Sequence, residues 1–344
     1  MAPLPPLAAD EPCRLMSLRK LNLIDTPLEE RFERITRLIR RIMSVKIAAV
    51  SLVEADRQFF KSIQGLQVTE TPRDVAFCAY TILADDLLVV PDARKDPRFA
   101  DNPLVTGEPG IVFYAGCPLH APDGFRVGSL CVIDSTPRQL TEQEGQTLRD
   151  LAQMIESELA GAKSHPAQST LVQDTTVDQR RDLVDPVTRL WNREAILGLA
   201  REVIDTDRLE TGCGLIVLSV NGVDPVNDER SQPAGEQALV TAARRILQGA
   251  GETDLVGRVG NNEFLVIVTH CDSPAEAKET ARRVLTRMTE SDVDADSPKL
   301  SVGVGIRFVE SGSVEPIEEH VNAARAATAE GRSDERPDSS WAAA

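Results

Sequence analysis

Aromatic and cationic residues are scarce in this chain. Phe, Trp and Tyr make up 4% of its 344 residues, and 54 acidic residues against 38 Lys and Arg give a formal net charge of −16. Sequence-independent binding of nucleic acid needs a basic surface that displaces counterions, and docking to an anionic membrane needs one too. The composition therefore predicts no nucleic-acid partner and no membrane partner.

Long hydrophobic runs and clustered metal ligands are missing as well. No apolar stretch approaches the roughly 20 residues of a membrane-spanning helix, and the opening MAPLPPLAADEPC lacks the basic and apolar regions of a secretory signal. The six cysteines and four histidines are scattered, and no two cysteines have CxxC spacing. This distribution is typical of reduced thiols that fill a core. We therefore expect a cytoplasmic protein with no resident metal or cofactor.

The length suits two domains rather than one core. In the first part, strand-like runs separated by an acidic turn and a Pro-Asp-Gly turn predict an α+β domain with an antiparallel sheet. A polar, proline-containing stretch follows, and the pattern restarts at Asp185. We expect a disordered N-terminus over 1–11, a first domain over 12–160, a linker over 161–184, a second domain over 185–332 and a disordered tail over 333–344.

Two helices of the first domain carry start signals. Thr26, with Pro27 at the first helical position and Glu29 behind it, predicts a capping box for a helix over 26–43. Thr141 and Glu144 predict a second capping box for a helix over 141–161.

The second domain contains three motifs in a fixed order: DPVTRLWNR at 185–193, LSVNGVDPVND at 218–228 and RVGNNEF at 258–264. Together they resemble the GGDEF domain of diguanylate cyclases, a nucleotide-cyclase-like palm with a central sheet and helices. The resemblance implies that Arg189 replaces a glycine of the first motif. It implies that the signature consists of Gly260, Asn261, Asn262, Glu263 and Phe264. The two asparagines keep a tight turn possible, because asparagine tolerates positive φ better than most residues.

Active members of this family condense two GTP molecules into cyclic di-GMP across a dimer, with divalent metal held by carboxylates. The resemblance places Ser219 and Asn262 where active members carry those carboxylates. Neutral side chains cannot replace two negative charges that face a triphosphate, and Mg²⁺ prefers carboxylate oxygen. We therefore expect both metal ligands to be lost and Glu263 to be the relic of the signature glutamate.

Other nucleotide contacts survive in part by the same resemblance. Asn227, followed by Asp228, and Glu236 stand at nucleotide-binding positions. The phosphate-binding lysine of the last helix becomes Thr328 or Ala329.

The product-inhibition motif Arg-x-x-Asp becomes GETD, in which Gly251 replaces the arginine and Asp254 is kept. Because the bidentate guanidinium is gone, we expect the inhibitory site to be lost.

The first domain resembles a GAF domain of the kind that precedes GGDEF domains in bacterial signalling proteins. The stretches that carry this resemblance include SLVEADRQFFKSIQGL, ETPRDVAFCAYTIL and FYAGCPLHAPDGFRVGSLCVID. GAF domains are small-molecule sensors or dimerisation modules with a pocket on one face of the sheet. The candidate pocket residues are Phe77, Cys78, Tyr80, Phe113, Tyr114 and Asp134, and their ligand is unknown.

The two resemblances predict a signalling protein in which a GAF sensor is joined to a catalytically degenerate GGDEF domain. Such a protein acts through a homodimer or a signalling partner and is not an enzyme. Two other interpretations stay open. One is an active diguanylate cyclase with atypical metal ligation, which needs Mg²⁺ and GTP, and the other is a GTP-binding switch without turnover.

Overall fold

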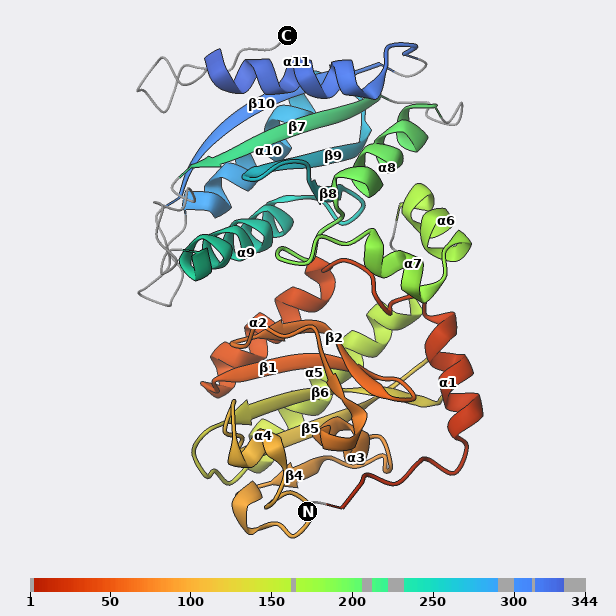
Figure 1. Cartoon of the computed structure of the whole chain (residues 1–344), viewed down its shortest axis with the longest axis vertical. Helices are drawn as coiled ribbons and strands as arrows, with labels where there is room; N and C mark the ends of the chain where they lie inside the picture. The colour runs from red at the N-terminus through yellow and green to blue at the C-terminus, as the bar shows by residue number, and fades with distance from the viewer. Residues whose placement is uncertain are drawn as a thin grey trace. The chain divides into compact units, whose positions relative to one another are not determined.

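The computed structural model describes residues 3–161, 165–205, 212–221, 232–289, 300–310 and 313–330. The chain divides into two compact units, Met1–Ala162 and Lys163–Ala344, drawn in red to yellow-green and in green to blue (Figure 1). Among the helices of the described ranges, none is both long and apolar enough to cross a membrane. The tail predicted over 333–344 lies outside the described residues.

The first unit is built on a six-stranded antiparallel sheet with the order β3-β2-β1-β6-β5-β4 (Figure 1). This architecture confirms the predicted α+β domain. Its strands are β1 (Ile47–Val53), β2 (Arg57–Gln64), β3 (Glu70–Pro72), β4 (Leu88–Val90), β5 (Phe113–His120) and β6 (Arg126–Asp134). Its helices are α1 (Glu11–Lys20), α2 (Glu30–Met43), α3 (Phe77–Thr81), α4 (Pro103–Thr106) and α5 (Glu142–Ala160).

The two faces of this sheet carry different helices. Successive side chains of a strand point to opposite faces, and Ser62 of β2 faces α2, where its hydroxyl lies 2.7 Å from Thr36 Oγ1. Helix α5 packs against α2 and β5. On the other face, Tyr114 of β5 and Cys131 of β6 contact Cys78 of α3. Helices α2 and α5 therefore cover one face, and α3 covers the face that would hold a ligand.

The two capping predictions have opposite outcomes. Thr141 and Glu144 form the predicted box at the start of α5, through N–H donors at 3.2 and 2.9 Å. The box at Thr26 and Glu29 is wrong, because α2 begins at Glu30 and neither side chain caps it. Both side chains instead contact Lys61, which is buried on β2. Its Nζ donates to Thr26 Oγ1 at 2.7 Å and pairs with Glu29 Oε1 at 2.6 Å.

The second unit is a four-stranded antiparallel sheet with the order β10-β7-β9-β8 between two layers of helices (Figure 1). Alternate residues of β7 serve two cores, with Leu215 and Val217 under α8 and α11, and Ile216 and Leu218 under α9 and α10. The strands are β7 (Gly212–Asn221), β8 (Leu255–Arg258), β9 (Glu263–Cys271) and β10 (Ser301–Val309). The helices are α8 (Arg193–Asp205), α9 (Gln232–Gly249), α10 (Pro274–Thr289) and α11 (Ile317–Glu330).

The segment 161–184, predicted as a linker, contains two short helices, α6 (Pro166–Asp174) and α7 (Val177–Asp182). Pro166 does not continue α5. It is the first residue of α6, a position where the missing N–H costs no helical hydrogen bond. Ala167 and Val172 join the core beneath α8, so α6 packs as part of the second unit.

Candidate functional site

The signature turn is held by the first motif of the second domain. Asp185 Oδ1 accepts from Thr188 N–H and Thr188 Oγ1, both at 2.7 Å, and pairs with Arg258 Nη1 at 3.3 Å. The same guanidinium donates to the Gly260 carbonyl at 3.1 Å and to the Asn261 carbonyl at 2.6 Å. One arginine therefore joins the DPVTRLWNR motif to the backbone of the hairpin.

The hairpin itself is confirmed, since β8 and β9 pair antiparallel on either side of the turn. The backbone of the turn differs from our expectation. The N–H groups of Val259 and Gly260 close it on the Glu263 carbonyl, at 2.9 and 3.3 Å. Neither asparagine of the turn adopts positive φ: in the described part of the chain, the non-glycine residues that do are Asn22, Asp25, Ser44, Arg189 and His270.

Arg189 keeps the backbone conformation of the glycine that we predicted it to replace, with φ at 59°. This conformation costs an L-residue roughly 1 kcal/mol. We expect Arg189→Gly to unfold at higher urea concentration than Arg189→Ala, by about 1 kcal/mol in the free energy of unfolding. The comparison with alanine removes the contribution of the arginine side chain. Equal stability of the two variants would show that the backbone is not strained at this position.

Ser219 and Glu263 face each other across β7 and β9, on the side of the sheet covered by α8 and α11. The Glu263 carboxylate accepts from Arg325 Nε of α11, with both oxygens at 3.1 Å. Arg325 Nη1 also donates to Asn322 Oδ1 at 2.8 Å. The structure thus joins the predicted relic glutamate to an arginine that sequence reasoning missed, because no local pattern links residues 62 positions apart.

Asn262 is held by the backbone of β7. Its side-chain Nδ2 donates to the Val220 carbonyl at 2.8 Å, and its backbone carbonyl accepts from Val220 N–H at 2.9 Å. These two bonds extend the β7–β9 pairing by one residue beyond Ser219 and Glu263. An ionised carboxylate has no proton to donate. An ionised aspartate at position 262 could therefore not make the side-chain bond to the Val220 carbonyl.

We expect Asn262→Asp to lower the free energy of unfolding by about 1–3 kcal/mol at pH 7, because a carboxylate would face the Val220 carbonyl without a proton. The folded state would raise the pKa of the new carboxyl above its unfolded value of about 4, so the deficit should shrink as the pH falls from 7 toward about 4. The matched control is Asn261→Asp at the neighbouring exposed position, with an expected change within about 0.5 kcal/mol. Similar losses in both variants, or a deficit that does not change with pH, would contradict the bond to Val220.

The structure describes two of the other predicted nucleotide positions, Glu236 and Thr328. Asn227 and Asp228 lie outside the described residues, and Glu236 is exposed on α9, on the other side of the sheet from α11. Thr328 is buried on α11, where its hydroxyl donates to the Arg325 carbonyl at 2.7 Å.

The GETD segment, where the resemblance places the inhibitory motif, forms a turn. Asp254 Oδ2 accepts from Gly251 N–H at 2.6 Å, and Oδ1 accepts from Thr269 N–H at 3.2 Å. Burial raises the pKa of this carboxyl. A Cβ on Gly251 would lie 2.9 Å from Oδ2, so an arginine at position 251 would displace the Asp254 side chain.

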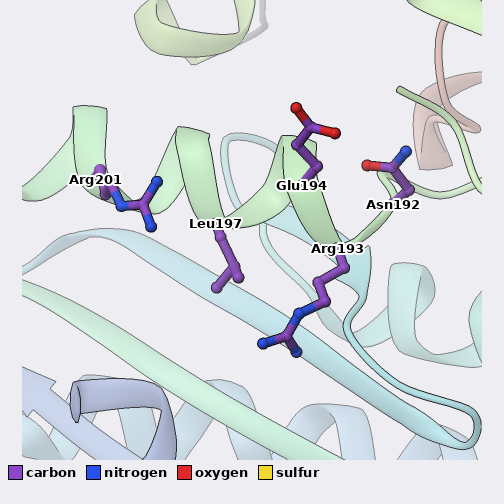
Figure 2. A pocket seen from close by; sticks show the side chains of 5 residues that line it. All are labelled: Asn192, Arg193, Glu194, Leu197 and Arg201. Carbon is purple, nitrogen blue, oxygen red and sulfur yellow. The ribbon is translucent and has the colours of Figure 1, made fainter. Parts of the chain in front are cut away.

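An open pocket of about 450 Å³ lies along the first turns of α8 (Figure 2). Arg193 and Leu197 point from the helix toward the sheet, whereas Glu194 points away from it. Arg193 donates to the Val259 carbonyl at 2.9 Å, beside the signature turn, and Arg201 pairs with Glu318. Both guanidinium groups of the pocket therefore serve to anchor α8. The lining residues are Asn192, Arg193, Glu194, Leu197 and Arg201.

The residues at the signature do not fit the Mg²⁺ that the cyclase resemblance implies. Ser219 and Asn262 are neutral, and Glu263 is engaged by Arg325. Mg²⁺ takes an octahedron of hard oxygen ligands that includes carboxylates. Within the described ranges, no group of three or more His, Cys, Asp and Glu side chains is arranged to hold a metal ion.

The first unit contains a small cavity of about 40 Å³ between α3 and the sheet. Of the predicted pocket residues, Phe77, Cys78 and Tyr114 line it. The cavity also contacts Gln58 and Thr71, which the sequence analysis did not single out.

The other three predicted pocket residues lie elsewhere. Phe113 precedes Tyr114 on β5 and therefore points to the opposite face of the sheet. Tyr80 packs edge-on against Phe99, with ring centroids 5.0 Å apart, and donates to the Pro3 carbonyl at 2.7 Å. Pro3 belongs to the segment predicted as disordered. Asp134 Oδ1 accepts from Ser135 N–H at 2.7 Å.

Comparison with known proteins supports two families along the chain. Residues 27–159 match the GAF domain model, and residues 182–337 match the model described as diguanylate cyclase, GGDEF domain. A cyclic di-GMP phosphodiesterase of Pseudomonas aeruginosa is 38% identical over 190 residues, which are 55% of this chain and 30% of that protein. The diguanylate cyclase DgcP of Escherichia coli is 26% identical over 205 residues, 57% of this chain and 58% of that protein.

Among solved structures, the diguanylate cyclase SiaD from Pseudomonas aeruginosa, in complex with its activator SiaC, is similar to 59% of this chain and 75% of that chain, at 24% identity and a TM-score of 0.43. The chain spans less than two thirds of the length of the two curated relatives. The family matches follow the order of the two units, and the chain therefore consists of a GAF domain followed by a GGDEF domain.

Proposed function

We propose that this protein is a cytoplasmic regulator in cyclic di-GMP signalling, in which a GAF sensor controls a GGDEF domain that makes no cyclic di-GMP. The GGDEF domain would act by dimerising or by binding a signalling partner. The relatives that match are a cyclic di-GMP phosphodiesterase and diguanylate cyclases, which favours this pathway. The observation that carries the proposal is the Asn262 amide, bonded to the Val220 carbonyl where a metal-binding carboxylate is expected.

Two further observations support a loss of catalysis. Ser219, at the other expected metal position, is a buried neutral side chain. The Glu263 carboxylate is neutralised by Arg325, so the remaining acid of the signature already has a cationic partner. Phosphoryl transfer depends mainly on positioning and on divalent metal that neutralises developing charge. A site with these groups lacks the negative charge that would hold such a metal.

The test is an assay of the full chain with GTP and either Mg²⁺ or Mn²⁺, with cyclic di-GMP detected by mass beside a working cyclase. The protein is used at concentrations where dimers are present by light scattering. We expect no product. Product that disappears in Glu263→Gln would overturn the proposal and establish an active cyclase with atypical metal ligation.

The same samples test the GTP-binding switch. A ligand that binds only the folded state raises the midpoint of thermal unfolding, so we expect no shift with excess GTP. A GTP-dependent shift that is lost in Asn227→Ala would establish a nucleotide switch without turnover. The control variant Gln153→Ala, at an exposed position of α5 in the GAF domain, should leave any such shift unchanged.

A further inference from the structure

Two buried thiols meet beside the GAF cavity. Cys78 of α3 and Cys131 of β6 are 53 residues apart in sequence, and their Sγ atoms lie 3.8 Å apart. Each is 1% exposed, and both are reduced. A disulfide needs an S–S distance of about 2 Å, so the two sulfurs must move closer together before they can bond.

The surroundings of Cys78 favour its thiolate. The Tyr114 hydroxyl donates to Cys78 Sγ at 3.3 Å and lies 2.7 Å from Thr81 Oγ1. Burial alone would raise the pKa of the Cys78 thiol, but its hydrogen-bonding neighbours outweigh burial and lower this pKa to about 7. Those neighbours are Cys131, Ser51, Tyr114 and Ser129. In contrast, burial raises the pKa of Cys117 to about 11 on the opposite face of β5.

The tyrosine hydroxyl reaches Cys78 because Gly116 leaves room for it. A Cβ on Gly116 would lie 2.3 Å from Tyr114 Oη and 2.9 Å from Thr81 Oγ1. Tyr114 and Gly116 share one face of β5, two residues apart. The glycine at position 116 of the same strand therefore allows the Tyr114 hydroxyl to lie close to Cys78.

The cavity next to the thiols has room for a very small molecule. Its volume of about 40 Å³ exceeds the share of one water, and Cys78, Cys131 and Tyr114 all line it. Gln58 and Thr71, cross-strand partners on β2 and β3, line the same cavity. Gln58 is 5% exposed, and its Oε1, like Thr71 Oγ1, has no hydrogen-bond partner within the described residues. Two thiols and two oxygen atoms without hydrogen-bond partners in the described residues thus belong to the side chains that border the cavity.

We propose that this cavity is a hydroperoxide-reactive site, in which Cys78 is oxidised and Cys131 resolves it to a disulfide. The Cys78 thiolate attacks the peroxide, the O–O bond breaks, and one oxygen stays on sulfur as a sulfenic acid. The other oxygen takes up the proton that Cys78 lost on ionisation and leaves as water or alcohol. The Cys131 sulfur then attacks Cys78 Sγ. The S–O bond breaks, the S–S bond forms, and the hydroxyl leaves as water with the Cys131 proton. Two electrons pass from the two thiols to the peroxide.

This inference does not depend on the inactivity of the GGDEF domain, because every atom that it uses lies in the first unit. Detection of cyclic di-GMP in the GTP assay would overturn the proposed function, but it would not affect the proposal of thiol oxidation. The oxidation assay in turn says nothing about GTP.

The experiment treats the full chain, carrying Cys13→Ser to remove the exposed thiol of α1, with hydrogen peroxide. Remaining thiols are alkylated in denaturant, and the unreduced digest is mapped by mass spectrometry. We expect a peptide pair joined through Cys78 and Cys131, formed at least tenfold faster than any oxidation of Cys117, and released by a thiol reductant. In Cys131→Ser, Cys78 should stop at a sulfenic acid that dimedone traps.

Cys117→Ser is the matched control, since it removes another buried thiol of the same sheet and should leave the crosslink unchanged. Gln58→Met should slow the oxidation about fivefold if Gln58 holds the peroxide by one hydrogen bond. The proposal is overturned if Cys78 and Cys131 stay alkylatable while free glutathione in the same sample is oxidised. It is also overturned if Cys117 oxidises as fast as Cys78, because the reaction would then report unfolding.

Discussion

Gly305→Ala is expected to lower the free energy of unfolding of the GGDEF domain by about 3 kcal/mol or more. A Cβ at this position on β10 would lie 1.8 Å from the Ala324 carbonyl oxygen and 2.9 Å from its carbon. Both atoms belong to the backbone of α11, so no side-chain rotation relieves the clash. The helix must move away from the sheet, and with it Arg325, the partner of Glu263.

Tryptophan fluorescence can follow this loss in the full chain. The sequence contains two tryptophans, Trp191 and Trp341, both in the second unit. Trp191 is buried against the core beneath α8, so its emission reports unfolding of the GGDEF domain and not of the GAF domain. We expect the urea midpoint of Gly305→Ala to fall sharply.

Gly198→Ala is the control with the opposite sign. Gly198 is exposed within α8, and a Cβ there would meet no heavy atom within 4 Å. Alanine is favoured over glycine in a helix interior by about 0.5–1 kcal/mol, so the urea midpoint should rise. If both substitutions changed the urea midpoint by the same small amount, the backbone of α11 would not lie in close contact with Gly305.

The contrast between these glycines shows what the sequence could predict. The signals that succeeded were local, such as the Thr141 capping box and the paired strands around the signature turn. The neighbours in sequence do not distinguish the two glycines. A Cβ at Gly305 would clash with a distant helix, whereas a Cβ at Gly198 would meet no heavy atom within 4 Å.

For the candidate site too, the sequence predicted the positions of residues but not their contacts. The motifs identified Asn262 and Glu263 by position, since the signature is contiguous. Their partners, Val220 and Arg325, come from another strand and the last helix. Cys78 and Cys131 gave no spacing signal because a sheet and a crossing helix bring them together. The partners of these residues could therefore not be predicted from any short sequence pattern.

Lys61→Met is expected to destabilise the GAF domain by about 3 kcal/mol, because it removes one of the two cationic partners of the Glu29 carboxylate, whose side chain is 16% exposed. Lys61 is fully buried, and its ammonium group contacts Glu29 Oε1 at 2.6 Å and the Pro27 carbonyl at 2.6 Å. After the substitution, Glu29 keeps its pair with Arg31, at 2.7 Å. Hydrogen exchange of β1 and β2 measures the loss in the full chain. Lys20→Met, at a lysine whose side chain is 76% exposed, should change stability by less than about 0.5 kcal/mol.

The pH dependence identifies Glu29 as the cause. Burial alone would raise the pKa of this carboxyl, but Lys61 and Arg31 outweigh burial and lower it below its usual value of 4.5. A lowered folded-state pKa contributes stability above the unfolded pKa, and that contribution is lost as the pH falls through the folded value. Without Lys61 the balance shifts toward burial, and Glu29 protonates at higher pH. The difference between the original protein and Lys61→Met should therefore narrow as the pH falls from 7 toward about 4. Adding Glu29→Gln to Lys61→Met should restore part of the lost stability at pH 7. If neither the lower pH nor Glu29→Gln reduced the stability difference, the destabilisation would come from lost packing alone.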